Sequence, residues 1–341
     1  LPSQHLGDLE NYETLQFFQE TLERMRRLFH VTPTAIAHDL HPGYLSTQFA
    51  LQQTSLRHIG VQHHHAHIAS CMAEHQLEGR VIGVAWDGTG FGTDGTIWGG
   101  EFLVAGYTSF DRHARLRPVL LAGGDSGIRE PWRAARSYLL DAFDGSLPAD
   151  PRWNLMASAE RIRIVDSMLQ RRVNTIPTSS AGRLFDAVAS LIGLRHTVSF
   201  EGQAAMMLEA AAESGSALSE GPYEFAFSGT APVDVDLRPM VRQIVSELDA
   251  GASSAQIAFR FHATLVAIVT RLCRRMRDDL QLHRVCLSGG CFQNALLLTG
   301  CVQSLRDAGF DVFIQREVPA NDGGISLGQA AVASEILRQE S

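Results

Sequence analysis

Hydrophobic residues recur along the chain at the spacing of amphipathic helices in several segments. The segment 10–30 is an example, because Leu15, Phe18 and Leu22 would share one face of a helix. A longer helix is predicted to run to Asp279, capped at its start by Ser253 or Ser254. Helices are also predicted over residues 45–53, 63–75 and 325–338, and residues 129–215 are predicted to be mainly helical.

Short apolar runs predict strands between these helices. The predicted strands cover residues 34–38, 59–61, 81–86, 96–105, 284–287 and 311–315, with strand and turn at 223–235. Two of the runs flank a glycine-rich turn that begins at Asp87, which is typical of a β-hairpin. We therefore expect the first strand of this hairpin to end on Asp87.

Glycine-rich loops occur at two distant places, 87–100 and 287–298. Paired loops of this kind favour an α/β fold with two lobes, like an actin-type ATPase core, over a single Rossmann sheet. Residues 1–30 would then form a linker and helix, and residues 31–80 the first lobe, completed by a helix within 322–341. Residues 81–321 would form the second lobe, with a helical insertion at about 129–215.

Composition and charge exclude several classes of site. All 29 basic residues are arginine, because the chain contains no lysine. A Walker A lysine, a Schiff-base lysine and a lysine general base are therefore excluded. A bound phosphate would have to be held by arginine, backbone N–H groups or a metal. The net charge of −8 argues against a broad nucleic-acid surface.

The chain contains no apolar run close to the roughly 20 residues of a membrane span, so no membrane partner is expected. Its five cysteines form no CxxC pair, which favours a reduced, cytoplasmic protein. The sequence has no signal-peptide pattern and begins on Leu1 rather than methionine. We therefore expect it to be part of a longer protein.

Four histidines lie within five positions, namely His63, His64, His65 and His67. On a helix, His63 and His67 share one face with Cβ atoms about 5–6 Å apart. This spacing suits two nitrogen ligands on one cation, and the pair His64 and His67 would also serve. A solvated polar helix face would give the same pattern.

Two aspartates can complete such a site. Asp87 follows a buried run, at the strand edge where ligands gather in α/β folds, and Asp322 precedes the last predicted helix. Either can equally be an ordinary turn or helix-capping residue. Two neutral imidazoles and two carboxylates neutralise the charge of a divalent cation. This donor set favours a site for Fe²⁺, Zn²⁺ or Mn²⁺ over a structural zinc site built from cysteine thiolates.

The segment from Gly90 to Gly95 spells GxGxxG, but a strand follows where a Rossmann helix is required. We interpret it as a hairpin loop that lets phosphate approach the backbone. The segment 287–294 predicts a strand, a tight turn and a helix start, whose N–H groups can bind an anion, although a plain strand–helix connection is the alternative. Cys291 in this turn has no identifiable base beside it, so it is not assigned as a nucleophile.

Arg183, Asp186 and Glu201 are charged residues in an otherwise apolar helical region. They are candidates for ligand binding, and surface salt bridges are the alternative.

Eight motifs together resemble one family closely. They are SQHLGDLEN, HDLHPGYLST, QHHHAH, WDGTGFGTDGTIWGGEF, GRLFDAVASLIG, FEGQAA, LSGGCFQN and NDGGISLGQ, and they span nearly the whole chain. They resemble the C-terminal transferase part of the HypF carbamoyltransferase family of [NiFe]-hydrogenase maturation. That part is similar to the tRNA threonylcarbamoyltransferase catalytic subunit, and both belong to the actin, sugar kinase and Hsp70 (ASKHA) superfamily.

The resemblance implies a reaction. A YrdC-like domain of the same full-length protein makes carbamoyl-adenylate from ATP. The part seen here would pass the carbamoyl group to the C-terminal cysteine of HypE, in the synthesis of the hydrogenase cyanide ligand. Acylphosphatase-like, zinc-finger and YrdC-like parts are missing from this chain, so it should not start from carbamoyl phosphate alone.

The resemblance also implies which residues act. The metal, iron or zinc, would be held by His63, His67, Asp87 and Asp322, and the first three are assigned as catalytic. ATP, AMP or carbamoyl-adenylate would be held by Gly88, Thr89, Gly90, Arg183, Asp186, Glu201, Gly202, Gly289, Gly290 and Asn294.

Three other functions stay open: a small-molecule O-carbamoyltransferase, a tRNA threonylcarbamoyltransferase-like enzyme and a non-catalytic ATP-dependent scaffold. The sequence Asp87-Gly-Thr-Gly replaces the Ser-Gly-Gly type of loop of the tRNA enzymes, which argues against a tRNA role.

Overall fold

The computed structural model describes residues 1–9, 11–147, 150–154, 156–215 and 221–341, so Glu10 of the predicted N-terminal helix lies outside the described residues. The α-helices are α1 (Tyr12–Leu28), α2 (Leu45–Leu51), α3 (His63–Glu74), α4 (Ser126–Arg129), α5 (Pro131–Ala142), α6 (Ala159–Arg171), α7 (Ala181–Leu191), α8 (Gln203–Glu213), α9 (Arg238–Asp249), α10 (Ser254–Leu280), α11 (Ala295–Asp307) and α12 (Ile325–Glu340). Short 3-10 helices are η1 (Pro151–Asn154), η2 (Gly290–Gln293) and η3 (Asp322–Gly324).

The strands form one large mixed sheet and one small sheet. They are β1 (Ala35–Asp39), β2 (Arg57–Val61), β3 (Val81–Phe91), β4 (Ile97–Ala105), β5 (Phe110–Leu116), β6 (Val119–Ala122), β7 (Thr175–Thr178), β8 (Ala226–Ser228), β9 (Val233–Asp236), β10 (Arg284–Ser288) and β11 (Asp311–Ile314). The large sheet has the order β11-β10-β3-β4-β5-β9-β8, and β7 joins it through β4. Strands β1 and β2 pair in parallel as the small sheet. The α/β fold is therefore confirmed.

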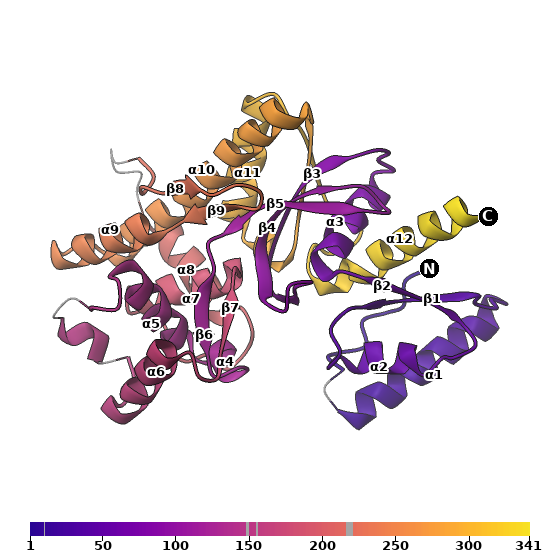
Figure 1. Ribbon diagram of the computed structural model, residues 1–341, viewed down its shortest axis with the longest axis horizontal. Helices are drawn as coiled ribbons and strands as arrows, with labels where there is room; N and C mark the ends of the chain where they lie inside the picture. The colour runs from indigo at the N-terminus through magenta and orange to yellow at the C-terminus, as the bar shows by residue number, and fades with distance from the viewer. Residues whose placement is uncertain (10, 148–149, 155, 216–220) are drawn as a thin grey trace.

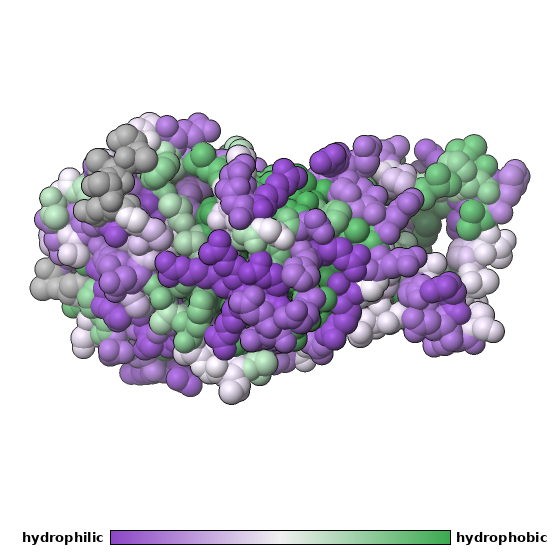
Figure 2. Space-filling view, turned by 90° about the horizontal axis from the view of Figure 1, so that it is seen from above, coloured by the Kyte–Doolittle hydropathy of each residue, from purple (hydrophilic) through white to green (hydrophobic). Residues whose placement is uncertain are grey.

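Figure 1 shows α1, α2, β1 and β2 gathered at one end of the molecule, with α12 running between them and α3. Buried apolar residues of β2, α3 and α12 form one cluster there, which includes Val61, Ala66 and Val332. A much larger core lies against the large sheet. Figure 2 shows hydrophilic residues over much of one face, and hydrophobic residues gathered at the narrow end. The domain boundaries expected from the sequence stay a prediction.

Helix ends follow the caps that the sequence offers. The hydroxyl of Ser253 accepts the N–H of Gln256, whose side chain accepts the N–H of Ser253 in return. This capping box decides between the two candidate serines and starts α10 at Ser254.

Among the described residues, no helix is both long and apolar enough to cross a membrane.

The hairpin differs from its prediction in one respect that matters for the site. Strand β3 does not end on Asp87 but continues to Phe91, and its pairing with β4 is irregular between Trp86 and Gly90. Asp87 therefore lies in a β-bulge, where an extra residue re-aims a side chain. The tight turn comes later, where the Gly92 N–H donates to the Thr96 carbonyl at 2.9 Å.

The region predicted to be mainly helical also contains β7, which pairs with β4 and β6. Residues 110–122, for which no element was predicted, form β5 and β6. Strand β5 carries Arg112, His113 and Arg115 among its apolar residues, so it has no continuous apolar run to identify it. Pairing with β4 and β9 holds it in the sheet despite this sequence.

Helices α3 and α12 approach closely at Gly328, where a Cβ would lie 1.8 Å from the Ala66 carbonyl oxygen. We predict that Gly328→Ala destabilises the protein by about 1–3 kcal/mol, because the added methyl group meets backbone and forces the helices apart. Ala330→Ser, which adds one atom on an exposed position of the same helix, is the control. Denaturant unfolding measures both, and equal stability of the two variants would contradict the close packing.

Candidate metal and nucleotide site

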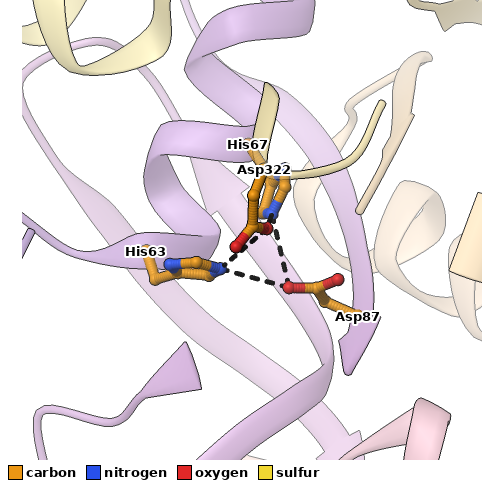
Figure 3. A group of neighbouring side chains, drawn as sticks. All are labelled: His63, His67, Asp87 and Asp322. Carbon is orange, nitrogen blue, oxygen red and sulfur yellow. Dashed lines mark hydrogen bonds and ion pairs between the residues drawn. The ribbon is translucent and has the colours of Figure 1, made fainter. Parts of the chain in front are cut away.

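Four side chains from three parts of the chain converge between α3, β3 and the turn before α12 (Figure 3). The Nε2 atom of His63 lies 3.1 Å from Asp87 Oδ2 and 3.5 Å from Asp322 Oδ1. The Nε2 atom of His67 lies 3.4 Å from each of the same two oxygens. Two imidazole nitrogens thus alternate with two carboxylate oxygens around one point.

Each ligand candidate is positioned by its element. His63 and His67 are one helical turn apart on α3, which begins where the Gln62 side chain accepts the His65 N–H at 2.9 Å. Both imidazoles are buried, and so is Asp87 in the bulge of β3. Asp322 begins η3, and its side chain stays 66% exposed. The site therefore has three buried donors and one open side.

Asp39 at the end of β1 fixes the orientation of His63. Its Oδ2 lies 2.9 Å from His63 Nδ1. A carboxylate accepts, so the Nδ1 of His63 donates to Asp39, and Nε2 is the nitrogen directed at Asp87 and Asp322, where a metal would have to displace any proton on it. A carboxylate behind a histidine in this way is the common arrangement at metal sites.

Asp87 is oriented in a similar way by the second glycine loop. The N–H of Gly290 donates to Asp87 Oδ1 at 2.9 Å, which leaves Oδ2 toward the histidines. Gly90 lies under the imidazole rings, because a Cβ there would come within 2.5 Å of His64 and 2.9 Å of His63. The two glycine loops predicted separately from sequence therefore meet at this carboxylate.

The charges of the cluster depend on one another. Burial alone would lower the pKa values of His63 and His67, but contacts with the carboxylates outweigh it and raise both. Burial alone would raise the pKa of Asp322, but the two imidazoles lower it to about 2. They also hold the pKa of Asp87 well below its usual range. The carboxylates of Asp87 and Asp322 thus favour the positively charged forms of His63 and His67, and would likewise favour a bound cation.

This donor set fits a divalent cation. Neither ring nitrogen of His67 has a hydrogen-bond partner among the described residues, although the ring is fully buried. Ligand bonds of about 2.0–2.2 Å in a tetrahedron place neighbouring donors about 3.3–3.6 Å apart, close to the separations found here. We propose that His63, His67, Asp87 and Asp322 bind iron or zinc. His64 is fully buried beside them, but it is not among the converging donors.

Arg183 and Asp186 of α7 form a buried ion pair with Nη2 and Oδ2 3.0 Å apart, so the alternative of a surface salt bridge is wrong. The Nε and Nη1 atoms of Arg183 are buried without a hydrogen-bond partner among the described residues. Burial raises the pKa of Asp186, and Arg183 opposes this shift. A buried guanidinium with unused donors suits a phosphate in a chain that has no lysine.

The predicted nucleotide-binding glycines and Thr89 lie at three places in the fold. Gly88, Thr89 and Gly90 follow Asp87 in β3; the Gly88 carbonyl accepts the Ser180 hydroxyl, and a Cβ on Gly88 would lie 3.2 Å from Glu201. Gly202 is the N-cap residue that precedes α8, with a φ of 76°. Gly289 precedes Gly290 after β10.

The helix start at Asn294 is already satisfied from within the chain. The Asn294 side chain accepts the N–H of Leu297 at 2.8 Å, and Glu209 accepts the N–H of Ala295 at 2.5 Å. An anion at this helix start would compete with two protein acceptors. The unused donors of Arg183 are therefore the better supported phosphate contact.

Two residues beside the metal candidates were not assigned from the sequence. Asp39 supports His63, and Tyr44 lies near enough to be influenced by the charges of Asp39, His63, Asp87 and Asp322. Both belong to the HDLHPGY segment, which was noted only as a motif. A polar residue directly after a predicted strand was the available signal for Asp39.

Comparison with known proteins places this arrangement in a family. The family model described as "Carbamoyltransferase, Kae1-like Domain, second subdomain" matches residues 83–329, and "HypF Kae1-like domain" matches residues 1–74. The chain belongs to the HypF carbamoyltransferase family. Carbamoyltransferase HypF of Synechocystis sp. is 40% identical over 342 residues, which cover 96% of this chain and 43% of that protein.

Two further HypF proteins extend the comparison. The "Carbamoyltransferase HypF homolog" of Cupriavidus necator is 39% identical, over 96% of this chain and 84% of its own length. A crystal structure of full-length HypF in the phosphate- and nucleotide-bound form is 43% identical with a TM-score of 0.91, and the match covers 98% of this chain and 52% of that one. This chain thus corresponds to about half of a full-length HypF.

We predict graded losses of metal when the ligands and their support are changed. The double variant His63→Ala, His67→Ala should bind almost none, because both nitrogen donors are gone. Asp39→Asn should weaken binding by about 10–100-fold, since only the support of His63 is altered. Elemental analysis after dialysis measures both, with the exposed His283→Ala as control. Unchanged metal in the double variant would rule this site out.

Metal binding should also release protons. The raised pKa values mean that His63 and His67 keep their protons to higher pH than ordinary histidines, and a metal must displace these protons. Apparent affinity should therefore fall as pH falls and rise with pH. Calorimetry in two buffers of different ionisation enthalpy counts the protons. A constant affinity between about pH 6 and 8 would contradict this charge assignment.

Proposed function

We propose that this chain is the carbamoyl-transferring part of a HypF protein. It would accept carbamoyl-adenylate and transfer the carbamoyl group to the C-terminal cysteine of HypE, in the cyanide-ligand synthesis of [NiFe]-hydrogenase. The observation that carries the proposal is the hydrogen bond from Gly290 to Asp87, which joins a glycine loop directly to the His–Asp cluster. In a chain of this family, that junction supports a site in which a nucleotide phosphate and a metal would be held side by side.

Nucleotide binding is supported from two directions. The similar full-length HypF was crystallised in a phosphate- and nucleotide-bound form. In this chain, Arg183 presents buried, unpaired donors on α7, and its charge influences Glu201 and Cys291. We infer that the adenylate lies along β3, α7 and the loop at Gly289, with Arg183 on its phosphate. Saturating AMP should then stabilise the fold by mass action.

The chain's own residues orient and hold the reactants. A bound divalent metal would act as a Lewis acid toward a carbamoyl or phosphate oxygen. Asp39 holds His63 through Nδ1, so that Nε2 faces the cluster, and Gly290 holds Asp87 through Oδ1, so that Oδ2 faces the cluster. Arg183 would stay on the phosphate as negative charge collects on the departing AMP, so that this charge is met by a fixed donor.

The acceptor thiol would come from outside the chain. Cys291 is the cysteine whose charge environment includes Asp87 and Arg183, and burial together with Asp87 raises its pKa well above the usual range. Cys71, Cys273, Cys286 and Cys301 are buried. A protonated thiol is a poor nucleophile, so none of these residues suits the step. This supports transfer to a partner's cysteine, in a reducing cytoplasmic setting, with a YrdC-like domain as the source of carbamoyl-adenylate.

We predict that the metal-loaded chain, supplied with carbamoyl-adenylate and HypE, adds one carbamoyl group to the terminal cysteine of HypE. Asp87→Asn and Asp322→Asn should slow transfer by about 10²–10³-fold, the usual effect of losing one electrostatic stabiliser. Asp311→Asn, an exposed aspartate on β11, is the control. Mass spectrometry of the HypE C-terminal peptide measures the product.

The same experiment separates the other functions. No product on HypE but carbamoylation of a small alcohol would favour a small-molecule O-carbamoyltransferase. Nucleotide binding without any transfer would favour a scaffold. Transfer at the wild-type rate by both aspartate variants would remove the His–Asp cluster from the mechanism.

A further inference from the structure

The turn that follows β1 is tied to the His–Asp cluster through Asp39. While Asp39 Oδ2 contacts His63, its Oδ1 accepts the N–H of His41 at 2.8 Å. Its backbone carbonyl accepts the hydroxyl of Thr47 at 3.2 Å. One carboxylate thus fixes both the orientation of His63 and the path of the turn from Asp39 to Tyr44.

The aromatic ring of Tyr44 is held in place at this turn. It stacks on the His41 ring, with ring centroids 4.2 Å apart and an interplanar angle of 17°. The His41 ring in turn meets Phe91 edge-on at 5.5 Å. Phe91 ends β3, the strand that carries Asp87, so these ring contacts connect the turn after β1 with that strand.

The Tyr44 hydroxyl is an unused donor in a charged surrounding. Burial raises the pKa of Tyr44 to about 12; His63 opposes this shift, and Asp39, Asp322 and Asp87 add to it. The phenol is therefore protonated at neutral pH and can act as a hydrogen-bond donor. None of the described residues accepts a hydrogen bond from the Tyr44 hydroxyl, so this donor is available to a ligand.

We propose that Tyr44 is a further catalytic residue, whose hydroxyl donates a hydrogen bond to the carbamoyl oxygen during transfer. This inference rests on the proposed function. The acceptor sulfur, after giving its proton to solvent, forms a bond to the carbamoyl carbon. The bond from that carbon to the adenylate oxygen breaks, and AMP leaves with the electron pair. Negative charge on the carbamoyl oxygen peaks between these events, when a fixed donor helps most.

Tyr44→Phe tests this role, because it removes only the hydroxyl and keeps the ring that stacks on His41. We expect the transfer rate to HypE to fall by about 10²–10³-fold. Metal content and the thermal stabilisation by AMP should not change. Tyr12→Phe removes an exposed phenol on α1, whose oxygen accepts from Gln16, and should leave all three measurements as in the wild type.

A second variant protects the test against a folding defect. Replacing Tyr44 by 3,5-difluorotyrosine keeps ring and hydroxyl but makes the phenol more acidic. If the phenol proton is needed, the transfer rate should fall as pH rises. This fall should begin at a lower pH in the fluorinated variant than in the wild type, because its phenol ionises more readily. An unchanged pH profile would overturn the inference.

The remaining outcomes are equally decisive. Wild-type transfer by Tyr44→Phe would overturn the role of Tyr44 and leave the proposed function standing. Loss of metal or AMP binding in Tyr44→Phe would show a structural role and overturn the inference too. Failure of transfer by the wild-type chain itself would overturn the proposed function, and the role of Tyr44 would fall with it.

Discussion

The structure depends on a line of three side chains, in which Asp39 and Asp87 contact the two nitrogens of His63 from opposite sides. Burying two carboxylates and an imidazole is costly unless each charge is matched. The match comes from elements far apart in sequence: β1, α3, β3 and the loop at Gly290. The positions of these elements are therefore set by one electrostatic arrangement as well as by apolar packing.

The fourth donor reaches the cluster only through helix packing. Asp322 lies in the turn before α12, and α12 is placed by its close approach to α3 at Gly328. The same helix buries Val332 against residues of β2 and α3. Gly328 lets α12 pack closely on α3. This packing places the Asp322 carboxylate beside His63 and His67, which lie more than two hundred residues earlier in the chain. The packing of α12 against α3 and β2 therefore contributes to the stability of the fold and also positions Asp322.

Local spacing rules predicted the parts of the site that lie on one element. His63 and His67 follow from helical periodicity, and Asp87 follows from the end of an apolar run even though β3 continues past it. Asp39 was missed because no spacing rule connects it to a histidine 24 positions away. The buried state of Arg183 and Asp186 was also unreadable, since an ion pair of this spacing looks the same on an exposed helix.

The His–Asp cluster is buried on one side and open to solvent on the other, which limits where a reactant can approach it. His63, His67 and Asp87 form a buried wall, whereas Asp322 is largely exposed. Of the nucleotide candidates, Gly290 donates directly to buried Asp87 and Arg183 is buried on α7, whereas Tyr44 comes from the turn tied to Asp39. In the proposed function, an acceptor that brings its own thiol would enter at the exposed side chain of Asp322. In the proposed transfer, the sulfur would add to the carbamoyl carbon from this open side, and AMP would then leave with the electron pair of the broken carbon–oxygen bond.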